Sequence, residues 1–357
     1  MCCVLIRRSC TPINLPTAEN PLEARKANSP VWNYLTDPVK EGIKNELLAA
    51  MQAEPEKSVR TKVCDTIATI GSTLVTNNLW PELLGHMMQC TKAADVNQRQ
   101  SALMVFEKLS EHVGPELKPF FPQLGQVFQE TMQDPDPVVQ RSAVVAFAAF
   151  ITSISKKDFA TFQPLAAAML AVMNTAQKEE EREDMMQALV EIATIAPTFL
   201  RNVLDQVTSL TVTTACNAQL DDDLRQMATE VLISMAEASP GMMRKHAGFQ
   251  QAFVPMCFQL MLEIEEDEEW YQRSEEDEED EDDTMYDCAL QLMDRLALSI
   301  GGKTVTPIVF NLIPQFVNHA EWKYRHAGLM AISQTGEGCA KMIKTQLAQV
   351  VQLVVAK

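Results

Sequence analysis

The sequence predicts an all-α protein, an open α-α superhelix made of HEAT-type helical repeats. Three observations support this fold class. The composition favours helices: 46% of the 357 residues are hydrophobic, only 6% are aromatic, and 12 are glycine. A short segment recurs along the chain at a near-constant interval, and each copy carries apolar residues at helical spacing. The 20 methionines and the abundant alanine agree, because these residues lose little side-chain entropy in a helix.

The repeat is marked by a basic or polar residue that is followed, about three positions later, by a small or apolar one. The marks are Arg60, Arg99, Gln140, Met185, Arg225, Tyr286 and Arg325. The intervals between them are 39, 41, 45, 40, 61 and 39 residues. Removing about 20 residues from the long interval restores a period of roughly 40 to 47 residues, which is typical of HEAT and armadillo repeats. We therefore expect a single array of about eight repeats over residues 1–357, with one insertion.

Each repeat contains two helical patterns. The second helix of one repeat shows apolar residues on one side, at Leu224, Met227, Ala228, Val231, Leu232 and Met235. The first helix of another shows the same spacing at Phe162, Leu165, Ala166, Met169, Leu170 and Met173. Prolines near the expected starts of first helices, where a missing N–H costs little, are Pro81, Pro119, Pro122, Pro164, Pro255 and Pro314. Such pairs must stack on their neighbours to bury these stripes, which predicts a solenoid with a long concave face.

Two segments interrupt or end the array. Residues 11–30 contain four prolines and few apolar residues, so we expect an irregular loop there. The chain begins inside one helical pattern at Met1 and stops inside another at residues 350–357. We therefore expect that it is incomplete at both ends.

The acidic charge is concentrated in the insertion. Residues 263–283 contain 15 acidic residues and one basic residue, a net charge of −14, whereas the whole chain carries −18, so the remainder carries only −4. Like charges repel one another, which predicts a solvated insertion loop. Two interpretations are open: a solubilising segment without a partner, or a binding site for basic proteins with a tryptophan anchor, which its place inside the array favours. The candidate residues are Glu265, Glu266, Asp267, Glu268, Glu269, Trp270, Glu275, Glu276, Asp277, Glu278, Glu279, Asp280, Glu281, Asp282 and Asp283.

Several functional classes are disfavoured. No apolar run reaches the roughly 18 residues of a membrane span, and no clustered basic face suits direct nucleic-acid binding. The nine cysteines and five histidines show no disulfide, zinc or nucleophile pattern, so we expect no catalytic residue, metal or cofactor. Gly301 and Gly302 precede a Lys-Thr pair but lack the rest of a phosphate-binding loop, and a helix end explains them fully.

Lys323 and Arg325 lie where the second helix of the last clear repeat begins. They either contact a partner from the concave face or form ladder-like salt bridges to a neighbouring repeat. The second interpretation is favoured, because stacked repeats place such side chains against one another.

The sequence also resembles the importin beta-3 branch of the karyopherin-beta nuclear import receptors. The residues that carry the resemblance are Trp322–Ala331 with Gly336–Cys339, Glu263–Trp270, Leu189–Ala193 and Leu5–Arg8, and their order and spacing agree along nearly the whole chain. Residues 11–30 depart from the family's pattern, and the family has a further first repeat and many later ones that are not found in this chain.

The resemblance implies a monomeric, non-enzymatic receptor that shuttles between cytoplasm and nucleus through the pores of the nuclear envelope. Its partners would be Ran-GTP, basic cargo proteins such as ribosomal proteins and histones, and phenylalanine-glycine nucleoporins, with no membrane. In the family the acidic loop helps to engage Ran and to sense cargo, which maps onto Glu265–Asp283 with Trp270. The alternative is a HEAT-repeat scaffold or chaperone for basic proteins that has no nucleotide switch.

Overall fold

The computed structural model describes residues 31–265 and 284–355, and within these ranges it contains helices and no strand. The predicted all-α helical-repeat fold is confirmed. The expected irregular loop at 11–30, the helical pattern at Met1 and most of the acidic insertion lie outside the described residues. None of the described helices is long and apolar enough to cross a membrane.

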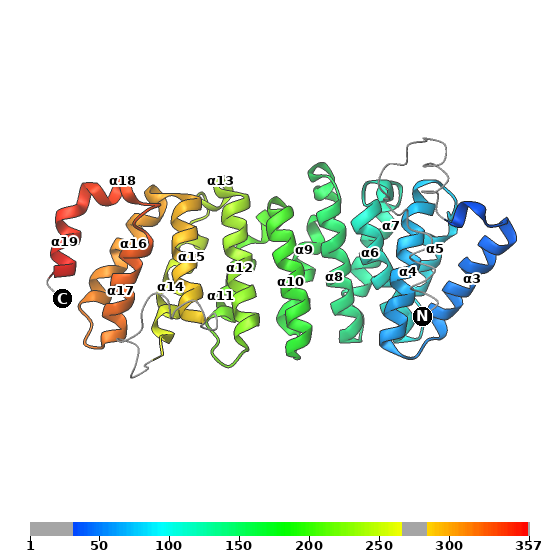
Figure 1. The fold of residues 1–357 in the computed structure, drawn as a ribbon, viewed down its shortest axis with the longest axis horizontal. Coiled ribbons are helices and arrows are strands. Elements are labelled where there is room, and N and C mark those ends of the chain that lie inside the picture. Colours follow the sequence, from blue (N-terminus) through cyan, green and yellow to red (C-terminus); the bar gives the residue numbers. More distant parts are fainter. Residues whose placement is uncertain (1–30, 266–283, 356–357) are drawn as a thin grey trace, which may run out of the picture. The chain divides into compact units, whose positions relative to one another are not determined.

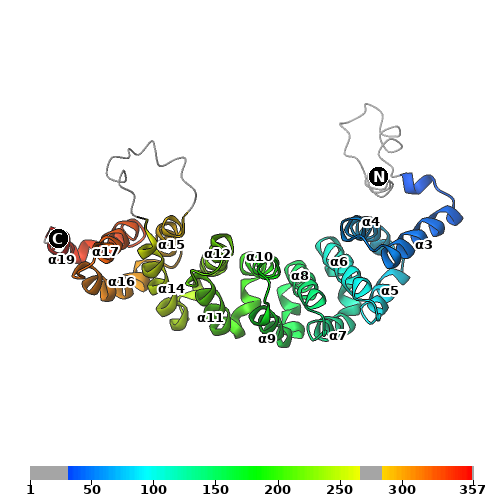
Figure 2. The same cartoon turned by 90° about the horizontal axis from the view of Figure 1, so that it is seen from below.

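The helices up to residue 172 form one compact unit, here called unit 1. Its first helices are α3 (Asp37–Ala53), α5 (Glu82–Cys90) and α7 (Phe121–Thr131), its second helices are α4 (Lys57–Thr76), α6 (Val96–Val113) and α8 (Pro137–Ser153), and α9 (Phe159–Thr175) follows. Three 3-10 helices, Val31–Tyr34, Pro115–Phe120 and Lys156–Asp158, join them. Within the unit, α4, α6 and α8 lie in one row, and α5 and α7 lie in another (Figures 1 and 2).

Unit 2 starts at Met173. Its second helices α10 (Glu179–Ile195), α12 (Asp222–Ala238), α15 (Met285–Ile300) and α17 (Trp322–Gln334) pack side by side, and we call them the second-helix row (Figure 2). The first helices are α11 (Leu204–Ala215), α14 (Ala247–Leu260) and α16 (Gly302–Val317). The short elements are α13 (Pro240–Met243), α18 (Ala340–Ile343), α19 (Leu347–Val355) and the 3-10 helices Pro197–Val203, Met261–Glu263 and Lys344–Gln346.

The predicted apolar stripes form the core. On α12, the stripe residues Leu224, Ala228, Val231, Leu232 and Met235 are fully buried, and only Met227 is half-buried. In unit 1, phenylalanines from α7, α8 and α9 pack edge to face, with 4.8 Å between the ring centroids of Phe150 and Phe162. Burying a side chain of this size contributes about 1.5–3 kcal/mol, and an aromatic pair adds about 0.5–1.5 kcal/mol.

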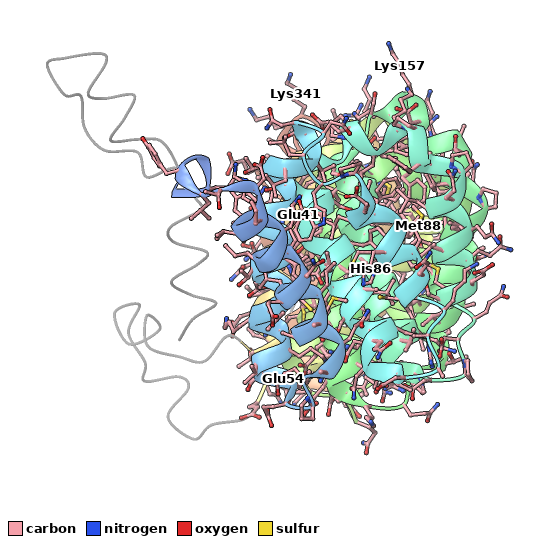
Figure 3. All side chains as sticks on the ribbon, turned by 90° about the vertical axis from the view of Figure 1, so that its right-hand side faces the viewer. Glu41, Glu54, His86, Met88, Lys157 and Lys341 are labelled. Carbon is pink, nitrogen blue, oxygen red and sulfur yellow. The ribbon has the colours of Figure 1, made fainter. Side chains whose placement is uncertain are left out.

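Polar side chains lie between the first helices of the first two repeats of unit 1. In Figure 3, Glu41 and Glu54 lie toward opposite ends of α3, and His86 belongs to α5. Gln52 on α3 approaches this histidine, with 3.0 Å between the Nε2 atoms of the two residues. Polar side chains thus link α3 to α5 as well as apolar ones.

The proline prediction is only partly right. Pro81 caps α5 and Pro122 lies in the first turn of α7, while Pro119 belongs to the 3-10 helix before α7. Pro164, Pro255 and Pro314 instead lie within α9, α14 and α16, so the predicted starts were wrong there. All three are exposed, and on an exposed face water can bond the carbonyl group that has lost its donor.

A side chain near the start of most second helices binds the loop before it. The donors are Arg60 (to Glu54 and Pro55), Arg99 (to Ala93 and Ala94), Gln140 (to Asp134), Arg182 (to Ala176), Arg225 (to Ala215) and Arg325 (to His319 and Ala320), all to carbonyl oxygens at 2.6–3.1 Å. Five of the seven sequence marks act in this way, and Arg182 takes the place of Met185. The remaining mark, Tyr286, instead pairs with His326 on α17. With Arg182, the intervals of 45 and 40 residues become 42 and 43. Met185 is instead a buried core residue.

Two of these arginines also reach a carboxylate of the next repeat, and we call each such ion pair a rung. Arg99 donates from Nε and Nη2 to Asp134 at 2.8 and 2.9 Å. Arg225 donates from Nη2 to both oxygens of Glu263 at 2.6 and 2.8 Å. Forked guanidinium–carboxylate bonds fix both distance and orientation, so each rung sets how one repeat stacks on the next.

We expect Arg225→Met to destabilise unit 2 by about 3 kcal/mol. The substitution keeps an apolar stem but leaves the Glu263 carboxylate and the Ala215 carbonyl without their guanidinium donor. Urea unfolding followed by circular dichroism measures the change. Arg201→Met, at an exposed arginine of the same unit, is the control. Equal losses in the two variants would contradict a structural role for the rung.

Candidate functional site

Acidic side chains gather where α10 and α12 begin. Glu179 is the first residue of α10, and Asp221 caps α12 by accepting the N–H of Asp223 at 3.0 Å. Glu179 Oε1 also accepts the N–H of Asp221 at 2.8 Å, which joins the two helix starts. We define the acidic surface as Glu179, Glu183, Asp184, Asp221 and Asp223.

The carboxylates of the acidic surface repel one another. Partial burial raises the pKa of Glu183, and the negative charges of Glu179, Asp221, Asp223 and Asp184 raise it further. Carboxylates are stabilised by the first turn of a helix, which explains Glu179 on α10 and Asp221 and Asp223 on α12. Glu183 and Asp184 follow the first turn of α10. Their proximity nevertheless leaves an excess of negative charge that a cationic partner would neutralise.

A groove of about 470 Å³ runs between α12 and α15, beside the acidic surface. Asp223, Glu230, Cys288, Gln291 and Arg295 are among the residues that line it. Arg295 donates to both oxygens of Glu230, at 2.7 and 2.9 Å, and also to Glu237. Burial opposes ionisation of Glu230, but the hydrogen bonds from Arg295 and Ser234 outweigh it and lower the pKa of that carboxyl group. The groove therefore carries both signs of charge, and an ion pair joins α12 to α15 within it.

The predicted acidic loop is seen only at its first residues. Glu265 is exposed, whereas Glu266–Glu269, Trp270 and Glu275–Asp283 lie outside the described residues. The main chain is held immediately before this point: Arg225 binds Glu263, and Lys323 Nζ donates to the carbonyl oxygen of Ile264 at 2.6 Å.

Lys323 and Arg325 have different roles in the structure. Lys323 contacts the neighbouring repeat through the Ile264 carbonyl oxygen, and not through the salt bridge that the favoured interpretation expects. Arg325 donates to the carbonyls of its own loop, His319 and Ala320. Both cations thus have partners within the protein.

An aromatic cluster covers α15 and α17 near these residues. Tyr286 Oη lies 2.8 Å from Nε2 of His326, and the Trp322 ring packs edge to face on the same imidazole at 6.0 Å. Burial lowers the pKa of His326, which keeps it neutral at pH 7. Within the described ranges, no three His, Cys, Asp or Glu side chains are grouped to hold a metal ion.

The acidic surface was missed by the sequence analysis, which assigned the acidity to the insertion alone. Residues 179–184 and 221–223 each carry several acidic residues, but basic residues elsewhere offset them in the net charge. The signal was local: two acidic runs at the starts of consecutive second helices, about one repeat apart.

Comparison with known proteins assigns the chain to a family. A family model described as "IPO5-like, TPR repeats" matches residues 55–210, and one described as "Importin repeat" matches residues 217–307. "Importin subunit beta-3" of Saccharomyces cerevisiae is 26% identical over 323 residues, 88% of this chain. The chain belongs to the karyopherin-beta importin family. The predicted resemblance is thereby confirmed.

Other importins agree with this assignment. "Probable importin-5 homolog" of Dictyostelium discoideum is 24% identical over 318 residues, 87% of this chain. The chain spans 29% of the length of each of these two relatives. Among solved structures, Kap121p bound to RanGTP matches with a TM-score of 0.77 and 26% identity, covering 90% of this importin chain and 31% of that one. Kap121p bound to Pho4p matches with a TM-score of 0.82 and 25% identity, covering 99% and 33%.

We expect Glu183→Gln to raise the melting temperature of this importin chain at pH 7 by roughly 1 °C. The raised pKa means that the folded state disfavours the ionised carboxylate, so stability falls as pH rises through that pKa. In acid, where Glu183 is protonated, the advantage of the variant should vanish. Calorimetric scans at both pH values test this, with Glu191→Gln, an exposed site on the same helix, as control. A gain that does not depend on pH would contradict the charge argument.

Proposed function

We propose that this importin-family chain is part of a nuclear transport receptor, and that the acidic surface on its second-helix row binds lysine- and arginine-rich segments of cargo proteins. The observation that carries the proposal is the juxtaposition of Glu179, Glu183, Asp221 and Asp223. Partial burial, together with repulsion from the neighbouring carboxylates, raises the pKa of Glu183. A cationic segment relieves this repulsion. Each contact lies near solvent and contributes little alone, so affinity comes from several contacts and falls with added salt.

The named complexes support the wider role. Kap121p, which is 25–26% identical to this chain, has been solved with RanGTP and with Pho4p. By analogy, we propose that this chain also binds Ran-GTP and cargo, that Ran-GTP releases the cargo, and that the acidic insertion from Glu265 to Asp283, with Trp270, contributes to one of these contacts. A receptor of this kind carries ribosomal proteins or histones from cytoplasm to nucleus, contacts phenylalanine-glycine nucleoporins at the pore, and catalyses no reaction.

A second candidate function is a scaffold or chaperone for basic proteins that has no nucleotide switch. The acidic surface favours it as well, because its charge attracts any cationic segment whichever nucleotide Ran carries. The two functions differ in only one measurable property, the discrimination between Ran-GTP and Ran-GDP.

Calorimetric titration with Ran-GTP, and separately with Ran-GDP, tests the switch. We expect heat of binding only with Ran-GTP, and weaker binding after Glu275–Asp283 is replaced by a neutral linker. A linker of the same length in place of residues 11–30 is the control. If neither form of Ran binds while a histone-tail peptide does, the chain is a plain binder of basic proteins.

The acidic surface is tested by charge reversal. We expect the triple variant Glu179→Lys, Glu183→Lys, Asp223→Lys to bind a lysine-rich histone-tail peptide about tenfold more weakly, since each lost contact contributes about 0.5 kcal/mol. Fluorescence anisotropy at two salt concentrations measures the change. The matched control, Glu46→Lys, Glu82→Lys, Glu116→Lys, alters the net charge equally at exposed sites of unit 1. Equal losses would show that only net charge matters, and no specific surface would remain.

A further inference from the structure

The rung between Arg99 and Asp134 defines a recurring position in the fold. Asp134 lies in the loop after α7, where its N–H donates to the carbonyl of Thr131 at 3.2 Å. Its Oδ1 accepts the N–H of Asp136 at 2.9 Å and also receives Arg99 Nη2 at 2.9 Å. The carboxylate thus closes a turn in its own loop and neutralises the arginine of the preceding repeat.

Asn217 makes the same pair of turn bonds after α11, as the second residue beyond that helix, whereas Asp134 is the third residue beyond α7. Its N–H donates to the carbonyl of Thr214 at 3.2 Å, and its Oδ1 accepts the N–H of Gln219 at 3.1 Å. These two bonds reproduce those of Asp134, so the residue is its counterpart, with an amide in place of the carboxylate. This junction of repeats therefore lacks the negative charge of a rung.

A carboxylate at position 217 would have neutralised the guanidinium group of Arg182. Its Nε donates to the carbonyl of Ala176 at 2.9 Å, as the other donors bind their loops. Within residues 31–265 and 284–355, the structure gives its Nη1 and Nη2 no hydrogen bond or ion pair. Arg99 and Arg225, in contrast, direct such groups at a carboxylate of the next repeat.

A cavity of about 220 Å³ lies between these two residues. Arg182, Asn217 and Thr213 give it polar walls, and Met173, Met185 and Met186 give it apolar ones. All of these residues belong to unit 2. Polar and apolar residues line the cavity in equal numbers, and Arg182 is the charged residue among them. A single charged group in such a mixed setting is best matched by a ligand with one opposite charge on a short apolar stem.

We propose that this cavity binds the carboxylate of an aspartate or glutamate side chain from a partner protein, which completes the rung beside Arg182 as Asp134 does beside Arg99. The chain itself supplies the template, because both observed rungs use a carboxylate. The nearby acidic surface disfavours a doubly charged phosphate and selects an acidic residue flanked by basic ones. This preference for basic flanks rests on the proposed function, whereas the carboxylate site does not.

Methionine methyl resonances report on the cavity directly. With ¹³C-methyl methionine labelling, we expect the peptide acetyl-Ala-Leu-Glu-Leu-Ala-amide to shift the signals of Met173, Met185 and Met186 in a saturable way, and the other methionines to serve as internal references. The same peptide with Gln in place of Glu should bind at least fivefold more weakly, and inorganic phosphate should leave these signals unchanged.

Two substitutions test the charge. Asn217→Asp supplies the carboxylate within the chain, so we expect it to abolish peptide binding and to raise the melting temperature by roughly 1–3 °C. Gln219→Glu adds the same charge to the same loop at a residue that is not among those lining the cavity, and it should do neither. Arg182→Gln should also abolish binding, without the gain in stability.

Three results would overturn the proposal: equal binding of the Glu and Gln peptides, equal shifts with phosphate, or equal effects of Asn217→Asp and Gln219→Glu. The first would show an apolar pocket, the second a site for any small anion, and the third a response to net charge alone. Failure here leaves the proposed transport function standing, because its tests use Ran, the insertion and the residues Glu179, Glu183 and Asp223.

Discussion

The stacking of this chain depends on one interaction, the bond between a side chain at the start of a second helix and the carbonyl groups of the loop before it. The loop between two packed helices leaves carbonyl groups without helical partners, and an arginine at this point satisfies them with a group that stays charged at any relevant pH. The guanidinium group has further N–H donors, and those of Arg99 and Arg225 bind a carboxylate of the next repeat. Loop closure and repeat spacing are thus set by the same side chain, which explains why the interval between marks varies so little.

The acidic surface follows from the same geometry. Carboxylates are favoured at helix starts because they cap free N–H groups and oppose the helix dipole. In a single helix, this preference for carboxylates affects only the start of that helix. When second helices lie side by side at a fixed period, their starts come together, and capping residues such as Asp221 and first-turn residues such as Glu179 merge into one charged patch. A local preference thereby produces a surface on which several carboxylates lie close together.

The sequence allowed the fold class and the paired helices to be predicted, because both depend on apolar periodicity and on composition. Buried stripes such as that of α12 follow directly from that period. The register of one repeat was wrong because the prediction followed an apolar pattern through Met185, whereas the recurring group is the loop donor, Arg182. The helix starts near Pro164, Pro255 and Pro314 were wrong because an exposed face tolerates proline within a helix. The acidic surface was not predicted because it brings together residues some 40 positions apart. The net charge of a sequence does not show which residues lie close together in space.

The two bonds at the root of the insertion have a mechanical consequence. The chain segment that leads to Glu265 is held by Arg225 of α12 through Glu263, and by Lys323 of α17 through the carbonyl of Ile264. A pull on this segment would therefore load the helices on either side of α15 at the same time. In a solenoid, each repeat touches only its neighbours, so such a load changes the orientation of one repeat relative to the next.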